Sequence, residues 1–292
     1  MTITKENDKL TILSGNYDRE KKYAVSVGHN GKNYVTIETV SENVLHVSEG
    51  NSKTGNNVFN FNFPIEYTCK HSCECYKNGS CYACNGCYNF ASNQAIYSEN
   101  YNFFRNSTEK EFTDAIQTVI NELNYKLFRY FTCGDIPNQK FVDCMVKLAK
   151  DNPDIMFWSY TKKYEIINRW IDENGNLPEN LTIIFSHWMN ENGSYFPMNN
   201  PHNLPTSEFI PLGKEYLTET VTHICPCSDP SVIATCATCE NPCYKLKKGQ
   251  SMGLLEHSTK QTKERDKKIR TAKENLKKEN KQAKKSNGKK GK

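Results

Sequence analysis

Apolar and polar residues alternate along roughly the first sixty positions of the chain, as they do in β-strands. β-Branched and aromatic residues recur in segments 22–28, 33–40 and 43–50, and turn-forming residues such as Asn and Gly lie between these segments. Residues 57–64 continue the alternation as Asn-Val-Phe-Asn-Phe-Asn-Phe-Pro. The pattern therefore predicts a β-rich N-terminal extension over residues 1–56, followed by a further strand.

From residue 107 onward the apolar spacing alternates between the periods of helices and strands. The first helical segment begins with a capping-box signal at Ser107, and apolar residues from Phe112 to Leu123 form one stripe along it. The predicted helices span residues 107–126, 138–153 and 164–175, and the predicted strands span residues 127–135, 154–163 and 181–188. This alternation implies parallel strands with crossover helices. We therefore predict an α/β domain of parallel β/α repeats over residues 57–257, in the form of a partial or distorted (β/α) barrel.

Small or polar residues stand at the points where these predicted strands end. They are Cys133, Gly134 and Asp135 after the first strand, Thr161 and Lys162 after the second, and Ser186 and His187 after the third. Parallel α/β folds bind ligands at the C-terminal ends of their strands. We therefore predict that Cys133, Gly134 and Asp135 bind a cofactor and that Asp135 is a catalytic group. The alternative interpretation is that Asp135 caps the next helix and that His187 is an ordinary surface residue.

Charge divides the chain into two unlike parts. Residues 258–292 contain fifteen Lys or Arg against four Asp or Glu, whereas the preceding body contains 23 basic and 29 acidic residues. The tail has too few apolar residues to offset the entropy of ordering it, so we expect it to be disordered. A basic tail of this kind is typical of nonspecific nucleic-acid binding, and the alternative is a tail that only increases solubility.

Eleven of the thirteen cysteines lie in two short polar segments. The first group is Cys69, Cys73, Cys75, Cys81, Cys84 and Cys87, and the second group is Cys225, Cys227, Cys236, Cys239 and Cys243. No apolar stretch resembles a secretory signal or a membrane span, so we expect a reducing, cytoplasmic compartment. There, clustered cysteines favour metal ligation over disulfides, although disulfides and incidental thiols remain alternatives. Cys144, on a predicted helix, is expected to be a buried small apolar residue.

Thiolates a few residues apart can converge on zinc or on an iron–sulfur cluster, and the spacing suits both. We expect a [4Fe–4S] cluster, with Cys69, Cys75 and Cys81 as its first ligands, and zinc is the alternative metal. Either group exceeds one closed site, so both groups could share a metal that ties the two segments together. His71, His223 and His257 lie near the cysteines and could replace a thiolate.

Several blocks of the chain, in order, resemble the gene product 88 family of phage and mobile-element proteins. They are KTGNNVFNFNFPIEYTC, CYACNGCYNFASNQAIYSENYNFF, FRYFTCGDI, NPDIMFWSYTK, LPENLTIIFS and HICPC…CATCENPCY…LLEH. The likeness covers roughly residues 50–257, and Cys84 and Cys87 are additions to the family pattern. The family takes its name from a phage reading frame, so the resemblance implies a phage-type protein in a host cytoplasm and implies no activity.

A second resemblance, to radical-SAM enzymes, concerns the order of the motifs. Those enzymes carry a C-x3-C-x2-C motif after their first barrel strand and a Gly-Gly-Glu-Pro segment after the second. Here the first cysteine group follows a strand, and the next strand ends in Cys133-Gly134-Asp135-Ile136-Pro137. The resemblance implies a [4Fe–4S] cluster with S-adenosylmethionine, but the cysteine spacings depart from that motif.

Other catalytic patterns are absent from the sequence. It contains no phosphate-binding glycine loop, no Gly-x-Ser-x-Gly elbow and no His-Glu-x-x-His pair. The hypotheses that remain are an iron–sulfur enzyme, a zinc-stabilised protein that binds nucleic acid through its tail, and a phage protein that binds a host partner.

Overall fold

The computed structural model describes most of the chain between residues 44 and 256 and five short strands before it. The described residues are 5–6, 9–10, 16–18, 23–27, 33–38, 44–51, 53–69, 75, 81–84, 86–189, 194–229, 232 and 234–256. The predicted basic tail, together with Cys73, His71 and His257, lies outside them.

An 11-stranded sheet forms the centre of the described structure. Its strands, in spatial order, are β12 (His223–Ile224), β13 (Ser251–Leu255), β11 (Thr206–Ile210), β10 (Leu181–His187), β9 (Met156–Thr161), β8 (Leu127–Tyr130), β7 (Val58–Phe61), β6 (Val44–Glu49), β5 (Asn33–Glu38), β4 (Tyr23–Val27) and β3 (Asn16–Asp18). Every pair from β12 to β7 is parallel, and every pair from β7 to β3 is antiparallel. The predicted α/β fold with parallel repeats is confirmed, and the sheet is open.

The N-terminal extension joins this same sheet. Its strands continue the sheet beyond β7, while β1 (Lys5–Glu6) and β2 (Lys9–Leu10) pair only with each other among the described residues. The strands predicted at 33–40 and 43–50 correspond to β5 and β6.

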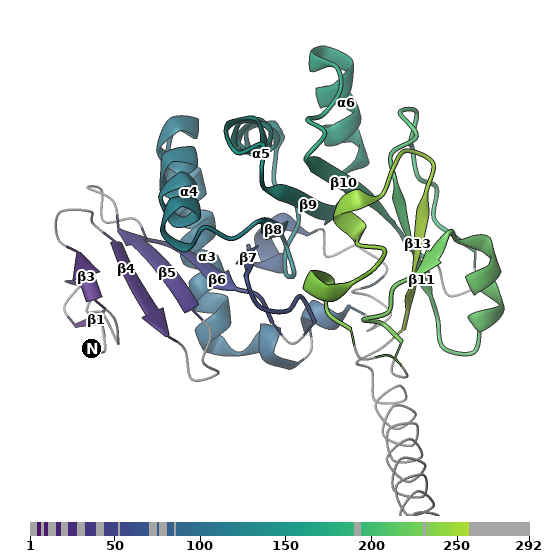
Figure 1. Ribbon diagram of the computed structural model, residues 1–292, viewed down its shortest axis with the longest axis horizontal. Helices are drawn as coiled ribbons and strands as arrows, with labels where there is room; N and C mark the ends of the chain where they lie inside the picture. Colours follow the sequence, from purple (N-terminus) through teal and green to yellow (C-terminus); the bar gives the residue numbers. More distant parts are fainter. Residues whose placement is uncertain are drawn as a thin grey trace, which may run out of the picture.

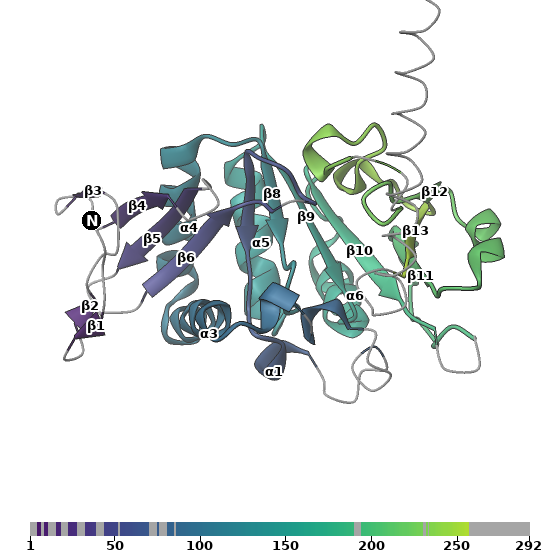
Figure 2. The ribbon, with the colours of Figure 1, turned by 90° about the horizontal axis from the view of Figure 1, so that it is seen from below.

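Three helices cover one face of the sheet (Figure 1). They are α4 (Glu109–Leu123), α5 (Gln139–Asp151) and α6 (Tyr164–Asn174). Strands β7, β8, β9 and β10 lie side by side in chain order, and right-handed crossovers in one direction place all their helices on one side. Figure 2 shows the opposite face, with α5 behind the strands.

Alternate residues of each strand face different layers. Phe157 and Ile183 pack with the helices in the main apolar core, whereas Trp158 and Ile184 pack on the opposite face with Cys243 and other residues of the C-terminal segment. The second face is therefore partly covered by the second cysteine group. This division places the functional candidates on the face that the helices leave free.

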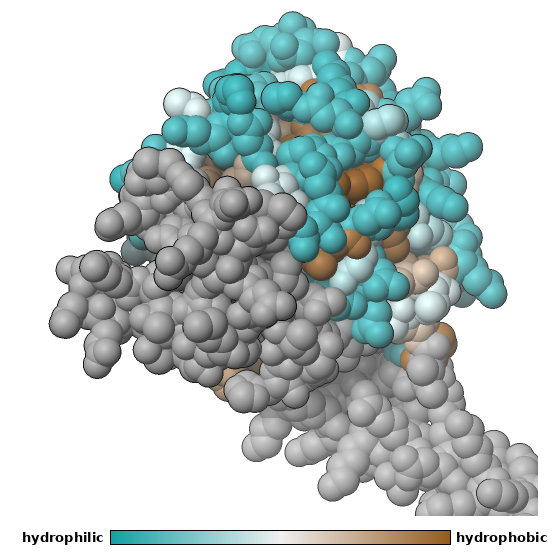
Figure 3. Space-filling model, turned by 60° about the vertical axis from the view of Figure 1, so that its left-hand side comes forward, coloured by the Kyte–Doolittle hydropathy of each residue, from teal (hydrophilic) through white to brown (hydrophobic). Residues whose placement is uncertain are grey.

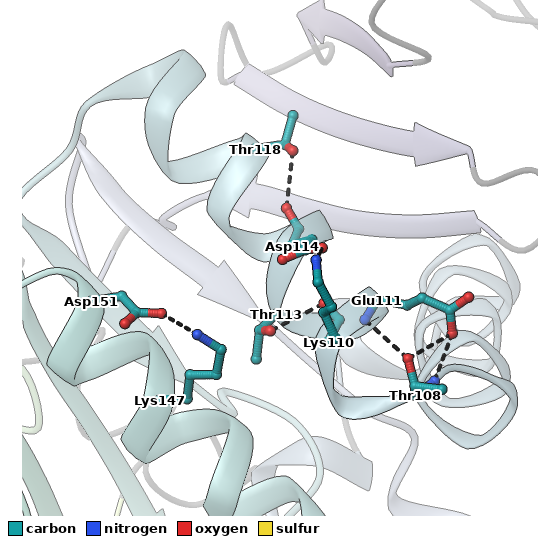
Figure 4. Close-up of polar contacts among 8 residues, drawn as sticks. All are labelled: Thr108, Lys110, Glu111, Thr113, Asp114, Thr118, Lys147 and Asp151. Atoms are coloured by element: carbon teal, nitrogen blue, oxygen red, sulfur yellow. Dashed lines mark hydrogen bonds and ion pairs between the residues drawn. The ribbon is translucent and has the colours of Figure 1, made fainter.

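Polar contacts fix the start of α4 (Figure 4). The Thr108 side chain accepts a hydrogen bond from the backbone N–H of Glu111, and the Glu111 carboxylate accepts one from the backbone N–H of Thr108. The cap is thus Thr108, one residue later than the sequence prediction of Ser107. The wrong residue was chosen because two hydroxyl residues are adjacent, and only Thr108 has a Glu three positions on.

Three parts of the fold were not predicted. Helix α3 (Ala91–Asn106) contains many polar Asn residues and has a weak apolar stripe. Strands β11 and β13 add to the parallel edge, and both are short and irregular in their apolar pattern.

None of the described helices is long and apolar enough to cross a membrane. On the face seen in Figure 3, the described residues are mostly hydrophilic, with small apolar patches among them.

Candidate functional site

A cavity of about 720 Å³ lies on the face of the sheet opposite α4, α5 and α6. Small-molecule sites typically enclose about 300–1,000 Å³. Cysteines of both groups line it: Cys69, Cys75, Cys81 and Cys87 from the first group, and Cys225, Cys227, Cys236 and Cys243 from the second. The structure therefore brings together two segments that are more than a hundred residues apart in sequence.

The first cysteine group follows β7 through the short helix α1 (Ile65–Thr68). Backbone bonds hold it in place, because the N–H of Cys81 donates to the carbonyl of Cys75 at 2.6 Å and the N–H of Cys84 donates to that of Cys81 at 3.1 Å. A hydrogen bond from the Cys75 side chain lowers the pKa of the Cys81 thiol to about 5. Burial raises the pKa of Cys84 to about 12. Cys81 is thus the thiol of this group best prepared to act as a thiolate ligand.

Asn62 shapes the turn that follows β8. Its side-chain oxygen accepts hydrogen bonds from the backbone N–H groups of Thr132 and Cys133 and from the Thr132 hydroxyl. Phe131 and Gly134 both have positive φ in this turn. A Cβ at Gly134 would lie 2.5 Å from the Phe63 carbonyl oxygen, so this position requires glycine.

Asp135 is a buried carboxylate on the cavity wall. Its oxygens accept hydrogen bonds from the Thr161 hydroxyl at 2.6 Å and from the backbone N–H groups of Lys162 and Ile136. Burial raises its pKa, although these bonds oppose the change. The carboxylate therefore joins the ends of β8 and β9, and about one of its four acceptor positions is left for another group.

The second cysteine group gathers on the other side of the same cavity. A hydrogen bond from Cys227 lowers the pKa of Cys225 to about 6 and that of Cys236 to about 7, while the pKa of Cys227 itself is raised. Burial raises the pKa of Cys243, whose sulfur accepts a hydrogen bond from the Tyr160 hydroxyl at 2.7 Å. Cys225 and Cys236 therefore ionise more readily than free cysteine, and Cys227 donates a hydrogen bond to each of them.

Arg129 of β8 lies between the two cysteine groups on the cavity wall. Burial is the largest single effect and lowers the pKa of the guanidinium, but the combined Coulomb attraction of Cys236 and the tyrosines Tyr82, Tyr160 and Tyr88 outweighs it, so the pKa is raised. The guanidinium also stands 5.3 Å from the centre of the Tyr160 ring. No ion pair joins it to a carboxylate among the described residues, and Cys236 is the group that raises the pKa of its guanidinium most.

The donor set fits a soft metal by its chemistry. The structure contains no disulfide among the twelve described cysteines. In the described part of the chain, no three His, Cys, Asp or Glu side chains are already spaced to hold an ion. Metal binding would therefore require the thiol side chains to rotate toward a common centre.

The predicted site residues divide into those that line the cavity and those that do not. Cys133, Gly134, Asp135, Thr161, Lys162 and Ser186 line it. His187 does not line it: its Nδ1 lies 2.7 Å from Glu208 Oε2, and its Nε2 lies 2.7 Å from the Phe196 carbonyl oxygen. Cys144 is buried in the main core, as predicted. His223 begins β12, two residues before Cys225.

Sequence reasoning missed the aromatic and cationic wall of the cavity. It includes Arg129, Tyr160, Tyr82, Tyr88 and Trp188. Lys162 lies 4.8 Å from the centre of the Trp188 ring. The sequence did hold one indication of the role of Arg129: it is a charged residue inside the otherwise apolar strand Leu127–Tyr130, and a cation in such a place needs a partner.

Comparison with protein-family profiles matches residues 39–203 to the family described as Gene product 88. The match spans more than half of the chain and contains the first cysteine group and strands β7 to β10. No curated protein and no solved structure matches the chain. The resemblance to radical-SAM enzymes receives no support from these comparisons.

Proposed function

The chain belongs to the Gene product 88 family, and we propose that it is an iron–sulfur protein that binds a small molecule beside its cluster. The observation that carries the proposal is a single cavity that is large enough for a ligand and is lined by three expected cluster ligands. These ligands are Cys69, Cys75 and Cys81. An iron–sulfur cluster bound by three cysteines keeps one iron open, and that iron can bind a ligand or transfer an electron.

The position of the cavity in the fold supports the proposal. The first cysteine group follows β7, and the Cys133-Gly134-Asp135 turn follows β8, so both lie at C-terminal ends of adjacent parallel strands. This edge is where parallel α/β folds bind their ligands. The cysteines of the first group and Asp135 thus line the same cavity.

S-adenosylmethionine is the small molecule that we propose for this space. Its amino group would donate to the remaining acceptor position of Asp135, and its carboxylate would pair with the cations of the wall. Arg129 and Lys162 supply those cations, and Trp188 and Tyr88 supply aromatic surface for the adenine. Titration of the iron-loaded protein with S-adenosylmethionine tests this ligand, and Asp135→Asn should weaken binding about tenfold if its carboxylate accepts from the amino group. An unchanged affinity would contradict that role.

Anaerobic purification of the full chain tests the cluster itself. The protein should be brown and contain iron and acid-labile sulfide in equal amounts, and Cys81→Ser should lose both. Cys144→Ala is the matched control, because Cys144 is a buried thiol on α5 that is far from the cavity lining. A colourless wild-type protein with zinc in the first group would instead support the zinc-stabilised alternative.

A further inference from the structure

A second, much smaller cavity lies next to the large one. Its volume is about 10 Å³, which is roughly the space of one water-sized sphere. All five cysteines of the second group line it, namely Cys225, Cys227, Cys236, Cys239 and Cys243. The remaining lining residues are Trp158, Pro226, Pro242, Tyr244 and Met252, none of which carries a charge. A space of this size lined by five cysteines is suited to a single cation.

Cys227 interacts with two other cysteines of this group. The Cys227 side chain is hydrogen-bonded to both Cys225 and Cys236. It also approaches the carbonyl oxygens of Ala234 at 3.5 Å and Lys53 at 3.6 Å. A metal ion that replaced the thiol proton of Cys227 would bind these three sulfurs after rotation of their side chains toward it.

The backbone holds these cysteines on three separate supports. The N–H of Cys225 donates to the Gly253 carbonyl of β13 at 2.8 Å. The N–H of Cys236, at the start of the 3-10 turn η4 (Cys236–Thr238), donates to the Lys53 carbonyl at 2.9 Å. Cys243 opens a second turn, η5 (Cys243–Lys245), and is buried against the sheet. Ligands on such fixed supports need only side-chain rotation to converge.

Two side chains of the sheet, Tyr160 and Arg129, donate hydrogen bonds to cysteines of this group. The Tyr160 hydroxyl donates to Cys243 Sγ at 2.7 Å, and the Arg129 guanidinium is hydrogen-bonded to Cys236. Donors of this kind orient metal-bound thiolates and offset their negative charge. A site of four thiolates on a divalent ion keeps a net negative charge, and the half-buried guanidinium of Arg129 would offset it.

We infer that the second cysteine group holds one tetrahedral, thiolate-bound cation of the zinc type, separate from the cluster proposed for the first group. The size of the small cavity excludes a four-iron cube without rearrangement of its walls, whereas the large cavity has room for one. Four of the five cysteines close a tetrahedral site, so one thiol is left over. The ion would fasten segment 225–243 to the sheet and thereby close one wall of the large cavity.

Metal analysis of single variants of the full-length protein tests this inference. Wild-type protein should contain one zinc per chain, and Cys236→Ser should lose it while keeping its iron. Cys81→Ser, the matched variant in the first group, should keep its zinc. Among the five Cys→Ser variants of the second group, four should lose zinc and one should retain it, which identifies the spare thiol.

Cobalt provides a second measurement for the case in which a Cys→Ser variant fails to fold. Wild-type protein stripped of zinc and loaded with Co²⁺ should show the intense visible bands of tetrahedral thiolate coordination. Tyr160→Phe should weaken zinc binding about tenfold, since it removes only the donor to Cys243.

Loss of zinc and iron together in both Cys81→Ser and Cys236→Ser would show one shared site and overturn the inference. Absence of zinc from wild-type protein, with no cobalt bands, would overturn it as well. This inference rests on the proposed function only for the first group. Zinc without iron in wild-type protein would support the zinc site and contradict the proposed iron–sulfur function, so a failure of one can be told from a failure of the other.

Discussion

Replacement of Gly134 by alanine should destabilise the turn that carries Cys133 and Asp135 into the cavity. Gly134 has φ +90°, and an added Cβ would lie 2.5 Å from the Phe63 carbonyl oxygen and 3.1 Å from the Phe63 Cβ. The first neighbour is backbone, so it cannot move aside as a flexible side chain would. Alanine therefore meets two separate penalties at this position.

The size of the effect follows from these two penalties. A left-handed backbone costs a residue with a Cβ about 1–2 kcal/mol. Inserting a methyl group into a packed site costs about 1–3 kcal/mol more. Gly134→Ala should therefore lower the free energy of unfolding by about 2–5 kcal/mol. Gly213 is the matched control, because it has φ +86° with nothing within 4 Å of an added Cβ.

Urea denaturation of both variants separates the two penalties. Gly213→Ala should cost only the backbone share of about 1–2 kcal/mol, so the two variants should differ by about 1–3 kcal/mol. Gly134→Ala should also lower the iron content, because the turn lines the cluster cavity. Equal losses of stability in the two variants would refute the argument that the Phe63 carbonyl crowds this turn.

Three further predictions concern other parts of the chain. Thr108→Ala removes the cap of α4 and should cost about 0.5–2 kcal/mol in urea denaturation. The pKa of His187 is raised, because its hydrogen bonds to Glu208 and Phe196 outweigh the opposing effect of burial. These bonds therefore stabilise the fold fully below the pKa of His187 in the unfolded chain, about 6.5. The stabilisation is lost as the pH rises through the higher pKa of the folded state. Glu208→Gln should flatten this loss in urea denaturation measured across that range. Deletion of residues 258–292 should abolish low-salt binding to labelled duplex DNA in fluorescence anisotropy and leave the iron content unchanged.

Each of these predictions has a result that would contradict it. Thr118→Ala is the control for the cap, since its hydroxyl donates only to the Asp114 carbonyl, and an equal loss there would argue against capping. An identical pH dependence in wild type and Glu208→Gln would exclude His187 as its source. Binding of DNA that survives removal of the tail would locate the contact in the folded body.

The regular part of the fold was predictable because its local and global signals agree. Helix α5 has a strong apolar stripe from Phe141 to Leu148, and strand β10 is a continuous apolar run bounded by polar residues. Both signals depend on neighbours in sequence. Helix α3 lacked such a signal, because its buried Asn100 is satisfied by distant carbonyl groups of His46 and Asn62.

The site was predictable only in its chemistry. Cysteine spacing indicated soft-metal ligands, and strand ends indicated Cys133, Gly134 and Asp135 at a ligand edge. The sequence could not indicate that the second cysteine group folds back over the free face of the sheet. That placement depends on pairing such as Cys236 with Lys53, which are 183 positions apart, and on packing of Cys243 against Trp158.

An anomalous difference map at the iron absorption edge, from crystals of the anaerobically purified full chain, tests the central claim most directly. The account predicts an iron peak among Cys69, Cys75 and Cys81 at the edge of the large cavity, with space for a ligand on its open side. A map without iron at that position, or with iron only among the cysteines of the second group, would contradict it.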